Sequence, residues 1–177
     1  MNEYIESSDI TTFSTDFKDR KDRWDDNSDI ERFIEFLKIM YRDRENVEYV
    51  PHPFGQYDVD LGVRIEGKWA IVFDLERMGP WDEEWPDYYS HVSFLDRKTK
   101  YINRPENFCM VWCNKSRNKF ITVDQEQLKR YRTVSRNVQG KNDRVKIISF
   151  ASARLYGFGT DLTKREKRIF KNHSVVK

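Results

Sequence analysis

Apolar and polar side chains alternate along residues 56–78. This two-residue period predicts β-strands, because successive side chains of a strand point to opposite faces of the sheet. Gly67 separates two alternating runs and can take the left-handed backbone conformation of a tight turn, so we expect a β-hairpin that turns at Glu66-Gly67-Lys68. The apolar positions of the two runs are Val59, Leu61, Val63, Ile65, Trp69, Ile71, Phe73 and Leu75.

The length of this turn decides which side chains share a face. A two-residue loop would place the apolar residues of one strand opposite the acids of the other, whereas an odd loop, such as three residues with Gly67 in a bulge, keeps the apolar set together. Consistent burial of one face favours the odd loop. The other face then collects the carboxylates of Asp58, Asp60, Asp74 and Glu76. Like charges this close repel, so we expect a cation among them.

The sequence around this hairpin predicts a helix and further strands. The helix begins near Ser28, where Ser28-Asp29-Ile30-Glu31 has the form of a capping box. Its apolar stripe, at helical spacing, consists of Ile30, Phe33, Ile34, Leu37 and Tyr41. Extended segments or strands are predicted at 47–53, 91–95, 108–113 and 119–123, the last two as a second hairpin.

The C-terminal part predicts two more helices. Asp124 is placed to cap a helix over residues 125–137, and a final helix is expected over 162–172. A strand at 145–150 and a loop at 153–161 lie between them. The order helix, strands, helix, strand, helix indicates an α/β or α+β fold with a mixed β-sheet flanked by helices.

Length and composition indicate one domain, which we place at residues 28–177 after a polar N-terminal arm, 1–27. Aromatic residues make up 15% of the chain, enough to supply a core although 35% of the residues are charged. Cys109 and Cys113 form no disulfide framework, which fits the reducing cytoplasm, or the host cytoplasm for a viral protein. No apolar run is long enough to span a membrane, so we expect no membrane partner.

Charge is distributed unevenly along the chain. From Leu128 to Lys177 there are fourteen Lys and Arg against three Asp and Glu. A basic segment of this kind indicates a polyanion as partner, although basic side chains on solvated surfaces give the same composition. The predicted nucleic-acid-binding residues are Lys129, Arg130, Arg132, Arg136, Lys164, Arg165, Lys167 and Arg168.

The acidic hairpin and the basic C-terminal part together predict chemistry on a phosphodiester. Metal-assisted hydrolysis needs a few converging carboxylates, and Mg²⁺ takes one or two of them from the protein. The predicted ligands for Mg²⁺ or Mn²⁺ are Asp60, Asp74 and Glu76, with Asp58 in reserve. Lys98 or Lys100, just after the strand at 91–95, is the candidate that positions or activates water or stabilises the charge of the transition state.

These motifs, YDVDL and FDLER in a hairpin that follows a helix, resemble the PD-(D/E)XK nuclease superfamily. Its core carries an Asp at the start of one strand and a (D/E)-x-K pair on the next, in a mixed sheet flanked by helices, the restriction-endonuclease-like core. Asp60 matches the first acid, with Asp58 as a rival, and Asp74 matches the second. Glu76 occupies the lysine position, as an acid does in some restriction endonucleases of this fold, and Lys98 is the candidate replacement.

The resemblance extends to an accessory acid, for which Glu31 or Glu35 on the first helix is the match. The segments VSFLDRKTKYI and FCMVWCN are further similar to small phage-type members of the superfamily. The resemblance implies a divalent-metal-dependent endonuclease, acting on DNA rather than RNA. Two alternatives stay open: a protein of this fold that binds nucleic acid without cleaving it, and an interaction protein whose acidic face docks on a basic partner. A homodimer is also left open.

Overall fold

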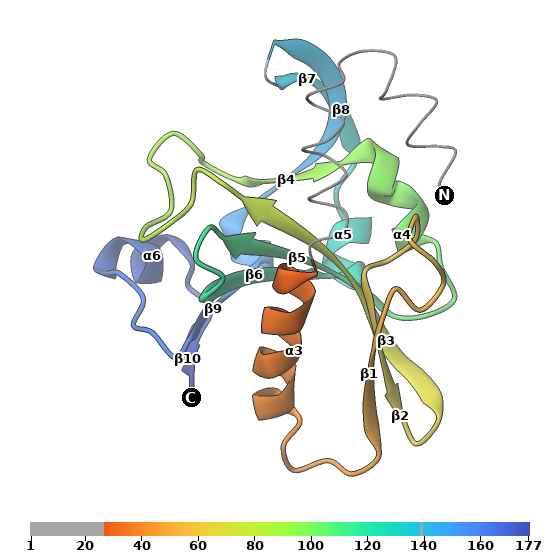
Figure 1. Cartoon of the computed structure of the whole chain (residues 1–177). Coiled ribbons are helices and arrows are strands. Elements are labelled where there is room, and N and C mark those ends of the chain that lie inside the picture. Colours follow the sequence, from red (N-terminus) through yellow and green to blue (C-terminus); the bar gives the residue numbers. More distant parts are fainter. Residues whose placement is uncertain (1–26, 139) are drawn as a thin grey trace, which may run out of the picture.

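The computed structural model of the protein describes residues 27–138 and 140–177, so the predicted N-terminal arm lies outside the described residues except for Asn27. In this part of the chain, ten strands form a seven-stranded sheet and a three-stranded sheet, accompanied by helices (Figure 1). In chain order the elements are α3 (Ser28–Met40), β1 (Val47–Pro51), β2 (Leu61–Ile65), β3 (Lys68–Met78), β4 (Val92–Leu95), η1 (Asp96–Lys98), α4 (Thr99–Ile102), β5 (Phe108–Asn114), β6 (Lys119–Asp124), α5 (Gln125–Lys129), β7 (Thr133–Val138), β8 (Lys141–Ile148), η2 (Phe150–Ser152), β9 (Arg154–Phe158), α6 (Lys164–Ile169) and β10 (His173–Val176).

The large sheet has the order β1-β2-β3-β5-β6-β9-β10 and the small one β4-β8-β7. Strand β3 pairs antiparallel with β2 and parallel with β5, and β9 pairs parallel with β10. The large sheet is therefore mixed, as the sequence predicts, and the fold is of the α+β kind. The chain between β3 and β5 makes a crossover that contains β4, η1 and α4, since parallel neighbours cannot be joined by a tight turn.

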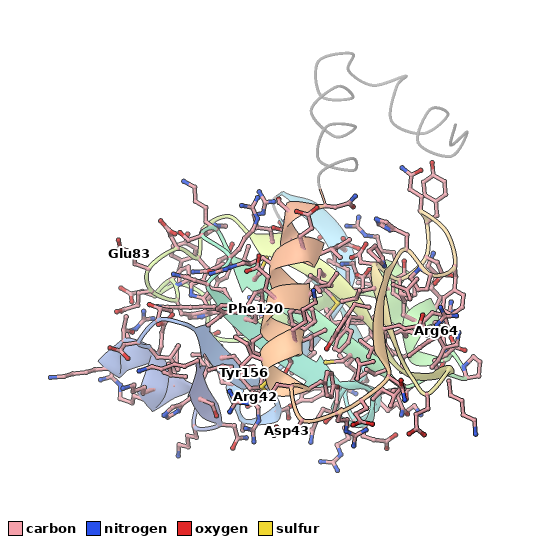
Figure 2. All side chains as sticks on the ribbon, turned by 60° about the horizontal axis from the view of Figure 1, so that its bottom comes forward. Arg42, Asp43, Arg64, Glu83, Phe120 and Tyr156 are labelled. Atoms are coloured by element: carbon pink, nitrogen blue, oxygen red, sulfur yellow. The ribbon has the colours of Figure 1, made fainter. Side chains whose placement is uncertain are left out.

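Helix α3 covers one face of the large sheet, where it stands in front of the strands in Figure 1. Its buried side chains include Ile30, Phe33 and Leu37 from the predicted stripe, together with Phe36. Figure 2 shows Phe120 and Tyr156 of the sheet at this helix, and the Phe36 ring lies 5.3 Å from the Phe120 ring. The helical spacing of apolar residues therefore identified the face that packs on the sheet.

The capping box at the start of α3 does not form. Ser28 is already the first helical residue and the N-cap is Asn27, whose side chain makes no capping hydrogen bond. The Asn27 carboxamide oxygen instead lies 3.0 Å from the imidazole Nε2 of His52. The helix start is thus tied to the segment that follows β1, a contact between residues distant in sequence.

A second core lies on the opposite face of the large sheet, beneath the small sheet. Val92, Phe94 and Ile148 of the small sheet share one buried cluster with residues of β3, β5 and β6. Trp81 and Trp85, from the loop after β3, are completely buried in the same cluster. This core positions the crossover above the face of β3 that does not contact α3.

The buried carboxylate of Glu166 anchors that loop to α6. It accepts hydrogen bonds from Lys119 Nζ at 2.6 Å, from Trp81 Nε1 at 2.9 Å and from the Trp85 amide at 3.1 Å. It also completes a capping box with Thr163 at the start of α6. Several donors satisfy this charge, which is the condition for burying a carboxylate without a large penalty.

The hairpin of β2 and β3 keeps most of its apolar side chains on one face, but not through the predicted three-residue loop. The turn has two residues, Glu66 and Gly67, with φ of 54° and 78°, because Ile65 pairs with Lys68. The pairing then shifts between Val63 and Arg64, which adds one residue to β3 as a bulge. The prediction of an odd loop was wrong, but the extra residue in the strand restores the same alternation.

The shared apolar face is correspondingly smaller than predicted. Six of the eight apolar residues lie on the side of α3: Leu61, Val63, Ile65, Ile71, Phe73 and Leu75. Val59 belongs to the opposite core. The Trp69 ring lies against Gly62 on the opposite face, where an added Cβ at Gly62 would meet Trp69 Cζ3 at 2.6 Å. The bulge separates Trp69 from the residues beyond it and so reverses its side.

The C-terminal part departs from the predicted helices. Asp124 does cap α5, accepting from the Gln127 amide at 2.8 Å, but α5 ends at Lys129 and residues 133–138 form β7. The predicted loop 153–161 contains β9, and the final helix is shorter than 162–172. The predicted strand at 145–150 is β8, which begins earlier. Hydrogen bonds from β8 to β7 and from β6 to β9 favour strands in these two segments and outweigh the local conformational preference.

Candidate functional site

The acidic residues of the hairpin lie on the face of the large sheet away from α3. Asp74 and Glu76 alternate along β3 with Phe73 and Leu75, which pack on the α3 side. Asp60 stands immediately before β2 and opposite β3, because its amide donates to the Phe73 carbonyl at 2.9 Å. Its carboxylate Oδ2 accepts from the Leu75 amide at 2.8 Å. Strand pairing therefore places Asp60 beside Asp74.

Lys98 enters this acidic cluster from the crossover. Its Nζ lies 2.8 Å from Asp74 Oδ2 and 3.0 Å from Glu76 Oε2. The side chains of Lys98 and Asp74 are 14% and 8% exposed, whereas Glu76 is 35% exposed. Lys100, the alternative candidate, is exposed and lies over the Tyr101 ring at 5.1 Å instead. Of the two lysines, Lys98 is the one that reaches the carboxylates.

The charge of Asp74 acts on the neighbouring buried carboxyl group of Asp60. Burial, followed by the charge of Asp74, raises the pKa of Asp60 to about 8, against the opposing effects of the Leu75 amide and Lys98. A hydrogen bond between the Asp60 and Asp74 side chains also raises this pKa. At neutral pH Asp60 therefore holds its proton, because ionising a buried carboxyl beside the charge of Asp74 is costly.

The surroundings of Lys98 raise its pKa and so keep the side chain charged. Burial by itself lowers the pKa of Lys98, but the charges of Asp74 and Glu76 and their hydrogen bonds outweigh burial and raise the pKa above its ordinary value. The ammonium group is therefore always protonated near neutral pH. It acts as a fixed positive charge rather than as a proton acceptor.

Tyr101 belongs to the same site although the sequence did not single it out. It follows Lys98 by three residues, one helical turn, and it is buried against the cluster. Burial, then the charges of Asp74 and Asp60, raises the pKa of its phenol. The signal for Tyr101 was its spacing from Lys98, which places both side chains on one side of a turn.

Asp58, the reserve ligand, is committed elsewhere. Its Oδ1 accepts from Arg104 Nη1 at 2.6 Å and from the Val59 amide at 2.8 Å. Arg104 also pairs with Glu106 at 2.8 Å. Asp58 thus belongs to an ion-pair cluster at the rim of the site, and Asp60 is the acid that joins Asp74.

The proposed accessory acids on α3 do not reach this cluster. Glu35 pairs with Arg32 at 2.6 Å and Glu31 is exposed. Both belong to the helix that packs on the opposite face of the large sheet, so the sheet separates them from Asp74. The expected match to an accessory acid was therefore wrong for both residues.

The predicted nucleic-acid-binding residues fall into two separate groups. Lys129, Arg130, Arg132 and Arg136 are exposed around α5 and β7. Arg130 and Arg132, with Tyr131, Val134 and Ile147, line a hollow of about 440 Å³. The other four lie on α6, on the opposite side of the molecule from α4 in Figure 1. One of them, Arg165, pairs with Glu84 at 3.1 Å and Asp87 at 2.9 Å.

Two of the three predicted ligands fit a divalent cation. Within residues 27–138 and 140–177, no three His, Cys, Asp or Glu side chains come together at a spacing that would hold a metal. Asp60 and Asp74 are adjacent, and Lys98 contacts one carboxylate oxygen each of Asp74 and Glu76. Two hard oxygen donors are what Mg²⁺ commonly takes from a protein, so Asp60 and Asp74 fit it, and Glu76 as third ligand stays a prediction.

Comparisons with known proteins gave no match: no protein-family model, no curated protein and no solved structure is similar to this chain at a significant level. The likeness to the PD-(D/E)XK superfamily therefore rests on the residues themselves. None of the helices in the described part of the chain has the length and apolar character needed to cross a membrane.

Proposed function

We propose that the protein is a divalent-metal-dependent endonuclease that hydrolyses phosphodiester bonds of DNA. The observation that carries the proposal is the convergence of Asp60, Asp74, Glu76 and Lys98, three acids and one lysine from three separate segments. These are the residue types that metal-assisted phosphodiester hydrolysis requires. They are also the residues that the resemblance to PD-(D/E)XK nucleases assigns to that chemistry.

The strand arrangement supports the same reading. Asp60 stands immediately before β2 and Asp74 lies on β3, the next strand, in a mixed sheet. A helix precedes this meander and a crossover follows it, leading to β5 parallel to β3. This is the placement of acids that the resemblance implies for the superfamily core.

Asp60 and Asp74 would hold the metal, Mg²⁺ or Mn²⁺. When bound, the ion supplies a hydroxide from its bound water and neutralises charge on the phosphate. Asp60 would release its proton on becoming a ligand, because a carboxylate must be ionised to bind a metal. The amide of Leu75 orients the Asp60 carboxylate through its hydrogen bond at 2.8 Å.

Lys98 would stabilise the negative charge that develops on the phosphate in the transition state. Its raised pKa keeps it protonated, so it does not serve as the general base that activates water. Glu76 holds Lys98 beside Asp74 through its contact at 3.0 Å. In this assignment Lys98 takes the place of the lysine that the superfamily carries at the position of Glu76.

Nicking of supercoiled plasmid DNA tests the proposal. Wild-type protein with Mg²⁺ or Mn²⁺ is expected to convert the plasmid to open circles, and Asp74→Asn to abolish conversion. Asp161→Asn, which neutralises an exposed acid away from the cluster, serves as the matched control and is expected to keep wild-type activity. Calorimetric titration with Mn²⁺ should show binding to wild type and none to Asp60→Asn; equal binding by both would refute the metal assignment.

One observation favours a second candidate, a protein of this fold that binds DNA without cleaving it. Lys98 contacts Asp74 and Glu76 together and so neutralises charge where a metal would. Such a protein would bind DNA with a steep salt dependence through its basic residues, yet show no nicking with either metal. The same plasmid assay therefore decides between the two candidates.

A further inference from the structure

Two aromatic rings and two guanidinium groups form a continuous row beside the candidate site. The Arg64 guanidinium lies over the Trp69 ring at 5.0 Å, the Trp69 and Phe54 rings are 5.4 Å apart, and the Arg104 guanidinium lies over Phe54 at 4.4 Å. We call these four residues the stacking row. Figure 2 shows Arg64 at the edge of the molecule that β1 and β2 form.

The row ends at the acidic cluster. Arg104, its last member, donates to Asp58 at 2.6 Å, and Asp58 precedes Asp60 by two residues. The backbone also links the two, because the His52 amide donates to the Asp60 carbonyl at 2.8 Å and Phe54 follows His52 in the same turn. A strand that lies along the row would thus arrive at Asp60.

The row is open to solvent at Phe54, whereas Trp69, Arg64 and Arg104 are half-buried and hold the rings in place. The Phe54 side chain is one of few large apolar groups in the described part of the chain that are exposed, at 39%. The Trp69 ring rests on Gly62, where any side chain would displace it. Fixed rings and planar guanidinium groups are the surfaces on which unpaired bases stack.

Charge indicates how the row would bind. Its arginines are already paired, Arg64 with Glu48 at 2.8 Å and Arg104 with Asp58 and Glu106. The row therefore offers stacking surface with little free positive charge, unlike the exposed arginines around β7. Paired bases in a duplex present only their edges and cannot stack on such a row, whereas an unpaired strand can.

We propose that the stacking row binds unpaired nucleotides of single-stranded DNA and leads them to the site of Asp60, Asp74 and Lys98. This deepens the proposed function and rests on it for the substrate class. A nuclease with this surface would act on DNA that carries a single-stranded segment, with the bases on the row and the phosphate to be hydrolysed at Asp60, Asp74 and Lys98.

Fluorescence anisotropy of the full chain with a labelled oligothymidylate of roughly 12 nucleotides, in EDTA, tests the row without cleavage. Phe54→Leu keeps an apolar side chain but removes the π-face, and it is expected to weaken binding roughly ten-fold. Phe54→Tyr keeps the ring and should bind as wild type. Tyr88→Leu is the matched control, because Tyr88 is 73% exposed on the loop that also carries Glu83, away from Arg64 in Figure 2.

The outcomes separate this inference from the proposed function. Equal binding by wild type and Phe54→Leu, equal losses in Phe54→Leu and Tyr88→Leu, or a parallel loss of duplex binding would each overturn the stacking row. If plasmid nicking depends on Asp74 while Phe54→Leu binds normally, the nuclease stands and the row fails. If nicking is absent while single-strand binding depends on the Phe54 ring, the row stands and the nuclease fails.

Discussion

The contact of Lys98 with two acids gives the most direct test of the site. Lys98→Met removes a nearly buried ammonium that lies 2.8 Å from Asp74 and leaves that carboxylate, 8% exposed, without its counter-charge beside Asp60. Removing one partner of a buried ion pair costs about 3–5 kcal/mol. The lower end, about 3 kcal/mol, applies because Glu76 is one-third exposed and solvent screens its share.

For a chain of this size, about 3 kcal/mol corresponds to a fall in Tm of roughly 6–12 °C. Urea denaturation and thermal melting measure the change, and Lys100→Met is the matched control because Lys100 is exposed two residues away. The control is expected to change the free energy of unfolding by less than about 0.5 kcal/mol.

A double-mutant cycle isolates the ion pair. Lys98→Met in an Asp74→Asn background removes both charges, so it should cost less than in the wild-type background, by a coupling of about 2 kcal/mol. Added Mg²⁺ should raise the Tm of Lys98→Met more than that of wild type, since the cation replaces the lost positive charge. The reasoning is refuted if Lys98→Met is no more destabilising than Lys100→Met, or if the cycle shows no coupling.

Three further predictions follow from other contacts. The folded-state pKa of Asp60 is raised to about 8, so its contribution to stability is fully present below its unfolded value near 3.8 and is lost as pH rises through 8. Thermal melts across this pH range should show a fall in Tm that Asp60→Asn lacks. Lys119→Met leaves the fully buried Glu166 without its counter-charge and should cost about 3 kcal/mol or more in urea denaturation, a change below about 1 kcal/mol being the contrary result. Gly62→Ala forces Trp69 from its place and should cost about 1–3 kcal/mol, seen in melting and as a shift of Trp69 emission; an unchanged melt would contradict the contact.

Sequence reasoning succeeded where the signal was periodic and local. The two-residue alternation identified the β2–β3 hairpin, and the helical spacing identified the buried face of α3. The cap at Asp124 was also a local signal, since the carboxylate bonds an amide three residues ahead. In each case the pattern reports which side chains must be buried or capped, and that requirement does not depend on distant partners.

It failed where a distant partner supplied the hydrogen bonds. Residues 133–138 carry no helix-breaking residue, yet they form β7 because β8 pairs with them. The segment 153–161 contains glycines typical of a loop, yet β6 and β10 flank it as β9. The difference between helix and strand propensity is smaller than the free energy that strand pairing and burial contribute. The tertiary partner therefore decides the secondary structure.

The sequence by itself determined that acids would line one face of a hairpin, because alternation and the burial of the apolar face leave them no other side. Only the tertiary structure decided how the two strands keep their apolar side chains on one face, by a bulge in β3 rather than a longer turn. It also decided the chemistry of the cluster: strand pairing sets Asp60 beside Asp74, and the crossover carries Lys98 onto Asp74 and Glu76. These contacts join residues more than a dozen positions apart, and no local pattern specifies which distant side chain arrives.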